Sequence, residues 1–284
     1  MKKILVPTDF SKQANIATAV AADIARKSGA DLVLLHVIEE VSGGSFNVEG
    51  EVASLQQDAE DSLFNLKLIQ KARKALEKAV LDPTIRDVNA DGELRVGNPF
   101  NAMRALIEKK KFDLVVMGTS GHTKIEEMLI GTNTEKIVRF SKVPVLTVQQ
   151  KPVSNNFKKI VYATSMAKEE EVFSRMVKRT QQIYNSNIHL VRINTPGDFQ
   201  RDYVVKNQMN RFAKQLGLKN YTINVYNDMN VEEGIIRFAE SIDADMIAMA
   251  THGRTGFAHV LAGSVAEDVV GHAKRPVLTF VVKH

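Results

Sequence analysis

Apolar residues follow two patterns along the chain: short runs and longer stretches with helical spacing. Residues 3–7 and 31–37 are mainly apolar runs of the kind found in strands that are buried on both faces. Between them, residues 12–28 place apolar side chains at helical spacing, and Gly29 follows as a stop signal. This part of the chain is therefore predicted to form a strand, a helix and a second strand.

The alternation of strands and helices continues to residue 148. We predict, in order, a long helical stretch over 52–80, strand pieces near 84–88 and 93–96, a helix from 98 to about 110, a strand over 114–117, a helix over 124–140 and a last strand over 143–148. Strands that alternate with helices indicate an α/β fold, in which a parallel, doubly wound sheet has helices on both faces.

The second half of the chain repeats the first. Three pairs of segments match: 2–9 with 158–165, 112–121 with 243–253, and 143–148 with 275–280. The first pair is offset by 156 positions, whereas Gly121 and Gly253 at the ends of the second pair, and the whole third pair, are offset by 132. The second copy is therefore 24 residues shorter in its middle. We predict two domains, residues 1–149 and 157–284, joined by a polar linker, and the length of 284 residues fits two domains.

The composition is that of an ordinary globular protein, with 44% hydrophobic and 25% charged residues. Cysteine is absent, which excludes disulfides, thiol nucleophiles and cysteine-based zinc sites and agrees with a cytoplasmic location. The N-terminus reaches Pro7 and Asp9 too early for a signal peptide. No stretch approaches the ~18 uninterrupted apolar residues of a membrane-spanning helix, so we expect no membrane association.

The net charge of +5 suits an anionic ligand. Nucleic acid is a poor candidate for that ligand. Tryptophan is absent, aromatic residues make up 6% of the chain, and no basic run is interleaved with aromatic residues.

Two loops carry the candidate chemistry, and both follow predicted strands. The first runs from Pro7 to Ser11 and places the carboxylate of Asp9 and the hydroxyls of Thr8 and Ser11 at the end of the first strand, just before a helix. The second runs from Gly118 to Gly121 and is followed after nine residues by Gly131, Thr132 and Asn133. In a doubly wound sheet, ligands bind beyond the carboxyl ends of strands where the strand order reverses.

The second loop has the properties of a phosphate site. Its glycines let the backbone approach a phosphate closely, and successive backbone N–H groups form an anion nest. Thr132 and Asn133 lie near the start of a predicted helix, where free N–H groups favour phosphate. His122 and Lys124 add positive charge just after Gly121. Gly-x-x-Gly alone is a weak signal, but its spacing from Gly131 and its place after a buried strand make it specific.

These motifs resemble those of the universal stress protein family, and the sequence looks like a tandem member over nearly its whole length. The family's ATP-binding motif is Gly, two residues, Gly, nine residues, then Gly-Ser or Gly-Thr. The first copy has it complete as Gly118, Gly121, Gly131 and Thr132. The resemblance implies that each copy forms a five-stranded parallel sheet with strand order 3-2-1-4-5, which makes the strands before the two loops neighbours.

The resemblance also implies which residues bind ATP. Asp9 is expected near the ribose, the phosphates or an accompanying Mg²⁺ ion, and Val37 near the adenine. The expected ATP-binding residues are Pro7, Thr8, Asp9, Val37, Met117, Gly118, Gly121, His122, Gly131, Thr132 and Asn133.

The second copy departs from the motif. Ala250 replaces the first glycine, Ser165 replaces the acid after the first strand, and Ala163 replaces the proline. The residues of a second nucleotide site would be Ala163, Thr164, Ser165, Ala250, Gly253, Arg254, Gly263 and Ser264. Two interpretations stay open: a degenerate half kept for packing, or a second nucleotide site that depends less on metal.

Other residues suggest packing roles. His36 lies in a predicted buried strand and is expected to be a packed core residue. The last apolar strands of the two copies, 143–148 and 275–282, are edges that need a partner. In the family this strand pairs repeats, so we expect the two copies to form an internal pseudo-dimer. A homodimer of the whole chain is a further expectation.

Three functions remain open from the sequence. The leading hypothesis is a regulatory, ATP-binding stress-response protein. The second is an enzyme that hydrolyses ATP slowly or transfers an adenylyl group, for which Lys12, His122 and Lys124 are the nearby candidates; a Walker A lysine motif is absent. The third is a scaffold that binds a protein without nucleotide.

Overall fold

A computed structural model of the chain describes residues 1–39, 51–119, 131–152, 154, 156–252 and 265–282. In the helix that begins at residue 51, side chains are described from residue 64 onward. The first copy contains β1 (Lys3–Pro7), α1 (Lys12–Ser28), β2 (Asp31–Ile38), α2 (Glu51–Val80), β3 (Ala90–Val96), α3 (Pro99–Lys109), β4 (Leu114–Gly118), α4 (Thr132–Phe140) and β5 (Val145–Val148). The second contains β6 (Lys159–Ala163), α5 (Glu170–Tyr184), β7 (Asn187–Asn194), α6 (Asp202–Leu216), β8 (Tyr221–Asn227), α7 (Val231–Ser241), β9 (Met246–His252), α8 (Val265–His272) and β10 (Val277–Val282).

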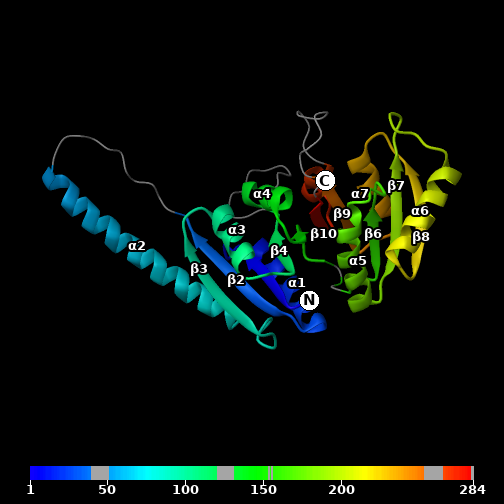
Figure 1. Cartoon of the computed structure of the whole chain (residues 1–284). Helices are drawn as coiled ribbons and strands as arrows, with labels where there is room; N and C mark the ends of the chain where they lie inside the picture. The colour runs from blue at the N-terminus through cyan, green and yellow to red at the C-terminus, as the bar shows by residue number, and fades with distance from the viewer. Residues whose placement is uncertain (40–50, 120–130, 153, 155, 253–264, 283–284) are drawn as a thin grey trace.

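The strands form one continuous sheet with the order β3-β2-β1-β4-β5-β10-β9-β6-β7-β8 (Figure 1). Within each copy the pairs are parallel and the order is 3-2-1-4-5, which confirms the predicted fold class. The copies meet at β5 and β10, which pair antiparallel with Leu146 opposite Leu278. The last strands therefore cover each other's edges, as the sequence predicted for an internal pseudo-dimer.

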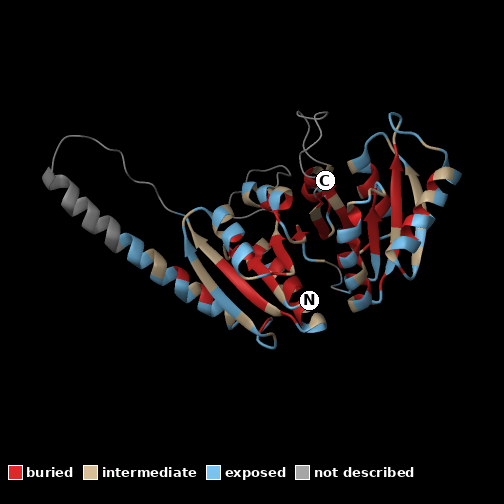
Figure 2. Cartoon of the chain, viewed as in Figure 1, coloured by how far each residue is buried: buried red, intermediate tan, exposed pale blue. Residues whose placement is uncertain are grey.

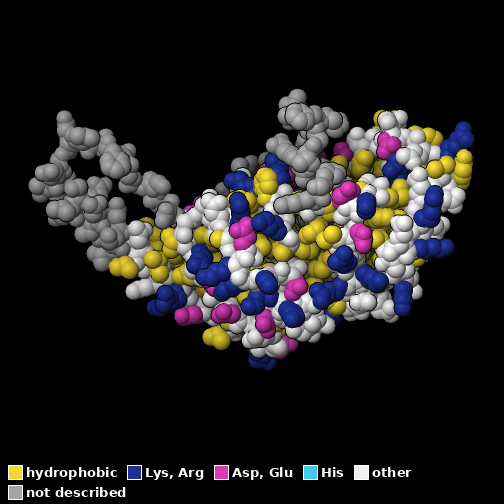
Figure 3. All heavy atoms as spheres, viewed as in Figure 1, with side chains coloured by type: hydrophobic (Ala, Val, Ile, Leu, Met, Phe, Trp, Pro, Cys, Tyr) yellow, Lys and Arg dark blue, Asp and Glu magenta, His cyan; other side chains and the backbone are white. Residues whose placement is uncertain are grey.

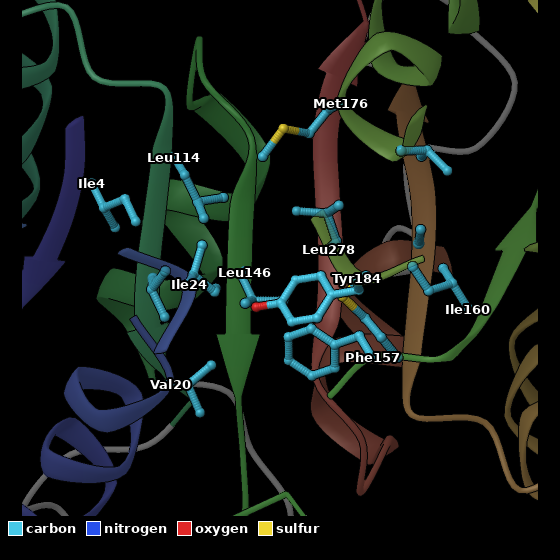
Figure 4. Packing of buried hydrophobic residues seen from close by; sticks show 14 of the residues in the cluster. Ile4, Val20, Ile24, Leu114, Leu146, Phe157, Ile160, Met176, Tyr184 and Leu278 are labelled. Atoms are coloured by element: carbon cyan, nitrogen blue, oxygen red, sulfur yellow. The ribbon is translucent and has the colours of Figure 1, made fainter. Parts of the chain in front are cut away.

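Helices cover both faces of the sheet. The central strands are mostly buried, whereas the edge strands β3 and β8 are partly exposed (Figure 2). One core cluster lies under α1, α2, α5 and α6 and runs without a break across both copies. At the junction, the rings of Phe157 and Tyr184 meet edge to face with centroids 5.0 Å apart, near Leu146 and Leu278 (Figure 4). The opposite face is covered by α3, α4, α7 and α8.

A charged pair also joins the copies. The guanidinium of Arg139 on α4 donates to both carboxylate oxygens of Glu267 on α8, at 2.7 and 2.6 Å. Bidentate pairs of this kind fix the relative orientation of the two side chains. In each copy, this helix comes directly after the segment with the glycine motif. The ion pair therefore links the two helices that follow the motifs.

The local sequence explains why α1 begins and ends where the pattern predicted. Ser11 caps its start by accepting a hydrogen bond from the backbone N–H of Ala14 at 3.2 Å. Gly29 ends it in the left-handed conformation with a φ of 66°, which only glycine adopts without strain. Most buried side chains of α1 are alanines, so the helix packs closely against β1 and β4.

Two details of the predicted elements were wrong. Residues 84–88 form successive turns instead of a strand, because the carboxylate of Asp82 accepts hydrogen bonds from the backbone and hydroxyl of Thr84 at 2.8 and 2.6 Å. Strand β3 therefore consists of Ala90–Val96 alone. The last strand starts at Val145 and not at residue 143. The part of the predicted 124–140 helix before residue 131 lies outside the described residues.

The long helix α2 extends past the edge of the sheet beyond β3 (Figure 1). Ala72 and Leu76 hold its C-terminal part to the core, whereas Phe64 is 57% exposed. Within the described parts of the chain, no helix is long and apolar enough to cross a membrane.

Candidate functional site

A pocket of about 360 Å³ opens at the carboxyl ends of β1, β2 and β4 in the first copy. Every described residue of the expected ATP-binding set lines it: Pro7, Thr8, Asp9, Val37, Met117, Gly118, Gly131, Thr132 and Asn133. The remaining two, Gly121 and His122, lie outside the described residues. The fold thus brings together side chains from three strands and the start of α4, which are far apart in the sequence.

The loop after β1 has a fixed geometry. The backbone N–H of Thr8 donates to the Leu35 carbonyl at 2.8 Å, which extends the pairing with β2 by one residue. The Thr8 hydroxyl accepts from the N–H of Phe10, and the Asp9 carboxylate accepts from the N–H of Ser11, both at 3.0 Å. These short-range bonds hold Phe10 at a φ of 63°, a conformation that non-glycine residues rarely adopt.

The other side of the pocket depends on close packing at Gly118. A Cβ atom at this position would lie 3.1 Å from the Cβ and 3.2 Å from the carbonyl carbon of Gln13 on α1. The glycine therefore lets the end of β4 approach the first turn of α1. The hydroxyl of Thr134 donates to the Gly118 carbonyl at 2.9 Å, which ties α4 to the same strand end.

The start of α4 faces the pocket without a side-chain cap. Gly131 is its N-cap and makes no side-chain hydrogen bond, while its own N–H donates to the Thr119 carbonyl at 2.7 Å. A helix N-terminus has N–H groups without partners inside the helix and carries a partial positive charge. This end of the pocket therefore suits an anionic group.

The pocket also contains residues outside the expected ATP-binding set. They are Ser11, Ala14, Leu35, His36, Glu39, Pro99, Met103 and Thr134. Most of them adjoin the expected residues at the same strand ends or helix starts. His36 and Glu39 lie at the carboxyl end of β2, and this position could have identified them, since ligands bind there in this type of fold.

The prediction that His36 is a packed core residue was wrong. Its ring lines the pocket, is half-buried, and lies 4.5 Å from the ring of Phe10 between centroids. Its Nδ1 atom is 2.7 Å from the carbonyl oxygen of Thr8. Because a carbonyl can only accept, Nδ1 is the donor in this hydrogen bond. His36 thus supports the loop that presents Asp9.

Acidic groups are prominent in the pocket. Asp9 and Glu39 line it, and the described lining residues include neither lysine nor arginine. In the described part of the chain, no group of three or more side chains has the arrangement of a metal site. On the surface, acidic side chains are interspersed among the lysines and arginines of the face shown in Figure 3.

The loop after β6 in the second copy has the same backbone design. Thr164 donates its N–H to the Val191 carbonyl at 3.1 Å, and its hydroxyl accepts from the N–H of Met166 at 2.8 Å. Met166 has a φ of 64°, which matches Phe10. Ala163, Thr164 and Ser165 therefore occupy the expected strand end. Ala250 lies in β9, and Gly253, Arg254, Gly263 and Ser264 lie outside the described residues.

A carboxylate nevertheless reaches this second loop, from Glu170 at the start of α5. It accepts hydrogen bonds from the hydroxyls of Tyr162, Thr164 and Ser165 at 3.0, 2.6 and 2.8 Å. It also accepts from the backbone N–H groups of Ser165 and Ala167 at 3.0 and 3.4 Å. Glu170 is 1% exposed.

The loss of the acid at Ser165 is evident from the sequence, whereas its replacement by Glu170 was not predicted. The feature of the sequence that could have revealed Glu170 is an acidic residue among the apolar positions on the buried face of α5. Burial, together with the charge of Glu170 and its hydrogen bond, raises the pKa of Tyr162 well above its usual value. The Tyr162 phenol therefore stays protonated and acts as a donor.

The next loop of the second copy is also held by side chains. Arg192, at the repeat position of His36, is 9% exposed and donates to the carboxylate of Asp198 at 2.7 Å. The side-chain amide of Asn194 donates to the Gln200 carbonyl at 2.9 Å. Both bonds hold the segment after β7 against the strand end, where the first copy has its long insertion.

Sequence comparison decides the family. The model of the universal stress protein family matches twice, at residues 1–149 and 156–281. The chain belongs to the universal stress protein family. Universal stress protein Slr1230 of Synechocystis is 25% identical over 295 residues, which cover 99% of this chain and 100% of that protein. This relative extends over both matched regions.

A second relative corresponds to half of the chain. Universal stress protein MJ0577 of Methanocaldococcus jannaschii is 32% identical over 157 residues, which cover 53% of this chain and 96% of that protein. Among solved structures, a universal stress protein from Archaeoglobus fulgidus matches with a TM-score of 0.70 and 18% identity, covering 98% of both chains. At that identity the structural match supports the fold.

Proposed function

We propose that the first copy binds ATP in the pocket between β1, β2 and β4, and that occupancy regulates the protein's conformation or its choice of partner. The observation that carries this proposal is the pocket itself, which is lined by every described residue of the family's ATP-binding motif. We take residues 1–149 as the nucleotide-binding domain and 157–284 as its partner domain.

The chemistry of the pocket supports each part of the ligand. The uncapped start of α4, with Gly131 and Thr132, would hold the phosphates. Apolar side chains, among them Val37 and Met103, would contact the adenine. Asp9 and Glu39 are acidic, so a polyphosphate would enter more favourably with Mg²⁺ than alone. Mg²⁺ would thus come with ATP, since the described residues contain no cluster for a resident metal.

The regulatory role is the leading hypothesis from the sequence. Of the candidates for an enzyme, His122 and Lys124 lie outside the described residues, and Lys12 is exposed at the start of α1. A cytoplasmic location and a homodimer of the whole chain remain predictions from the sequence.

Calorimetric titration of the nucleotide-stripped, full-length chain with Mg-ATP tests the proposal. The informative variant is Thr132→Glu, because Thr132 is exposed and a carboxylate in the first turn of a helix favours the helix. The same carboxylate would repel phosphate, so affinity should fall roughly 100-fold without loss of folding. Val231→Glu, at the first residue of α7 in the second copy, is the matched control and should bind as the wild type does.

The outcomes separate cleanly. Binding that weakens in Thr132→Glu and persists in Val231→Glu supports the pocket as the nucleotide site. Absence of heat with the wild-type chain, or equal binding by both variants, would reject it and favour the scaffold hypothesis.

A further inference from the structure

Glu170 and Ala14 occupy the same position of the two repeats. The offset of 156 residues that relates β1 to β6 also relates the helices that follow them. Buried residues of α1 and α5 coincide at this offset: Ala17 with Phe173, Val20 with Met176, Ala21 with Val177, and Ile24 with Thr180. The two loops before these helices share their left-handed residue and the bonds made by the hydroxyl and the backbone N–H of Thr8 and Thr164. A side chain at position 14 or 170 therefore faces the same loop in its copy.

The two side chains have opposite consequences for that loop. Ala14 lines the open pocket of the first copy and ends at its methyl group. Glu170 extends into the second loop, and its carboxylate gathers two backbone N–H groups and three hydroxyls. Donors that converge in this way are what a bound anion requires. The second loop therefore already holds an anion, and that anion belongs to the chain.

We infer that Glu170 is the internal occupant of the second copy's anion site, and that the residue at position 14 or 170 determines which copy admits an external anionic ligand. The buried carboxylate uses the donors of the loop and repels a phosphate that approaches it. The expected stoichiometry is one ATP per chain, and this part of the inference rests on the proposed function. The occupation of the loop by Glu170 is independent of whether the chain binds ATP.

Removal of the carboxylate tests the occupation directly, with acetate and inorganic phosphate as probes. Glu170→Ala should lose thermal stability, and acetate or phosphate at tens of millimolar should restore roughly 3 °C or more relative to chloride at equal ionic strength. Glu171→Ala is the matched control, because Glu171 is the next residue and is exposed. The wild type and Glu171→Ala should show no such anion dependence.

Addition of the carboxylate to the first copy tests the selectivity. Ala14→Glu brings a second carboxylate to the loop that carries Asp9 and should weaken Mg-ATP binding roughly 100-fold or more. Circular dichroism checks its fold, because Val6 and Asp9 stand where the second copy has the hydroxyls of Tyr162 and Ser165. Asn15→Glu adds the same charge at an exposed neighbour on α1 and occupies the repeat position of Glu171. It should bind ATP within a few-fold of the wild type.

The results distinguish this inference from the proposed function. Anion-dependent rescue of Glu170→Ala supports the inference even if the wild-type chain binds no ATP. No rescue, rescue that equals that of Glu171→Ala, or two ATP molecules per wild-type chain would overturn it. If Glu170→Ala fails to fold even with acetate, the comparison of Ala14→Glu with Asn15→Glu still decides: equal ATP affinities would contradict the assigned role.

Discussion

The two strand-end loops of this chain differ in one decisive way, although their backbones are built alike. Thr8 and Thr164 accept from the residue two positions on, and that residue is left-handed in both copies. The first loop adjoins a pocket of about 360 Å³. In the second loop, the hydroxyls of Thr164 and Ser165 and the backbone N–H of Ser165 donate hydrogen bonds to the carboxylate of Glu170.

The difference shows that a repeat can keep its fold while its site changes. The family model matches both regions of the chain, so family membership alone does not indicate which copy binds a ligand. The distinction lies in single residues at equivalent positions, such as Ala14 and Glu170. Four predictions test this contrast, in order of decreasing expected effect. Tryptophan is absent and the five tyrosines all lie in the second copy, so tyrosine fluorescence reports on that copy.

The largest effect is expected from Thr164→Val compared with Thr8→Val. The Thr164 hydroxyl both donates to Glu170 and accepts from Met166, so its loss leaves a buried carboxylate and an N–H short of a partner. We expect Thr164→Val to lower the free energy of unfolding by about 2–3 kcal/mol. Urea unfolding followed by circular dichroism measures both variants, and tyrosine fluorescence follows the second copy in Thr164→Val. Thr8→Val should cost less, and an equal cost would show that the Glu170 network adds nothing.

The second effect concerns the junction between the copies. Arg139→Met removes the bidentate partner of Glu267, whose side chain is 9% exposed. The lost pair should cost about 1–2 kcal/mol, since the guanidinium is itself partly exposed. Urea unfolding followed by circular dichroism measures the change. Arg104→Met, which removes an exposed pair on α3, is the control and should leave stability unchanged; a similar loss in both would contradict a role at the junction.

The third effect is steric. Gly118→Ala places a Cβ near the backbone of Gln13, whereas the second copy already has alanine at the equivalent Ala250. We expect Gly118→Ala to destabilise the chain by about 1 kcal/mol and to weaken ATP binding, because α1 must move away from β4. Thermal melting and calorimetry measure the two effects. Ala250→Gly should leave ATP binding unchanged, and a loss there would mean that the second copy contributes to the site.

The smallest effect depends on pH and belongs to the first copy. The ammonium of Lys110, 2.6 Å from Glu93, lowers the pKa of that carboxyl below its usual value. A lowered pKa contributes stability above the unfolded-state pKa, and this contribution is lost as the pH falls through the folded-state pKa. Glu93→Gln should therefore remove less than about 1 kcal/mol at neutral pH and nothing in strong acid. Stability of both chains measured from pH 7 to pH 3 should converge; a constant gap would contradict this origin.

The sequence was sufficient for most of the fold because buried parallel strands and amphipathic helices have distinct periodicities. The apolar runs at 3–7 and 31–37 became β1 and β2. The failure at 84–88 has a local cause: Asp82 and Thr84 form a turn whose side-chain bonds outweigh the β propensity of neighbouring residues. Periodicity cannot register such short-range polar bonds.

The site was less predictable where its residues act through tertiary contacts. Motif spacing was enough to select Gly118, Gly131 and Thr132, which line the pocket. It could not show that His36 turns toward Thr8, or that Glu170 returns a carboxylate to a loop that had lost one. Both depend on how a helix and a strand end pack together, which no local pattern encodes.

A crystal structure of the full-length chain grown with Mg-ATP tests the central contrast most directly. The account predicts nucleotide density in the first copy, with phosphates at the start of α4 near Gly131 and Thr132. In the second copy, Glu170 should keep its bonds to Thr164 and Ser165. Nucleotide in the second loop with Glu170 displaced, or an empty first pocket at saturating Mg-ATP, would contradict the account.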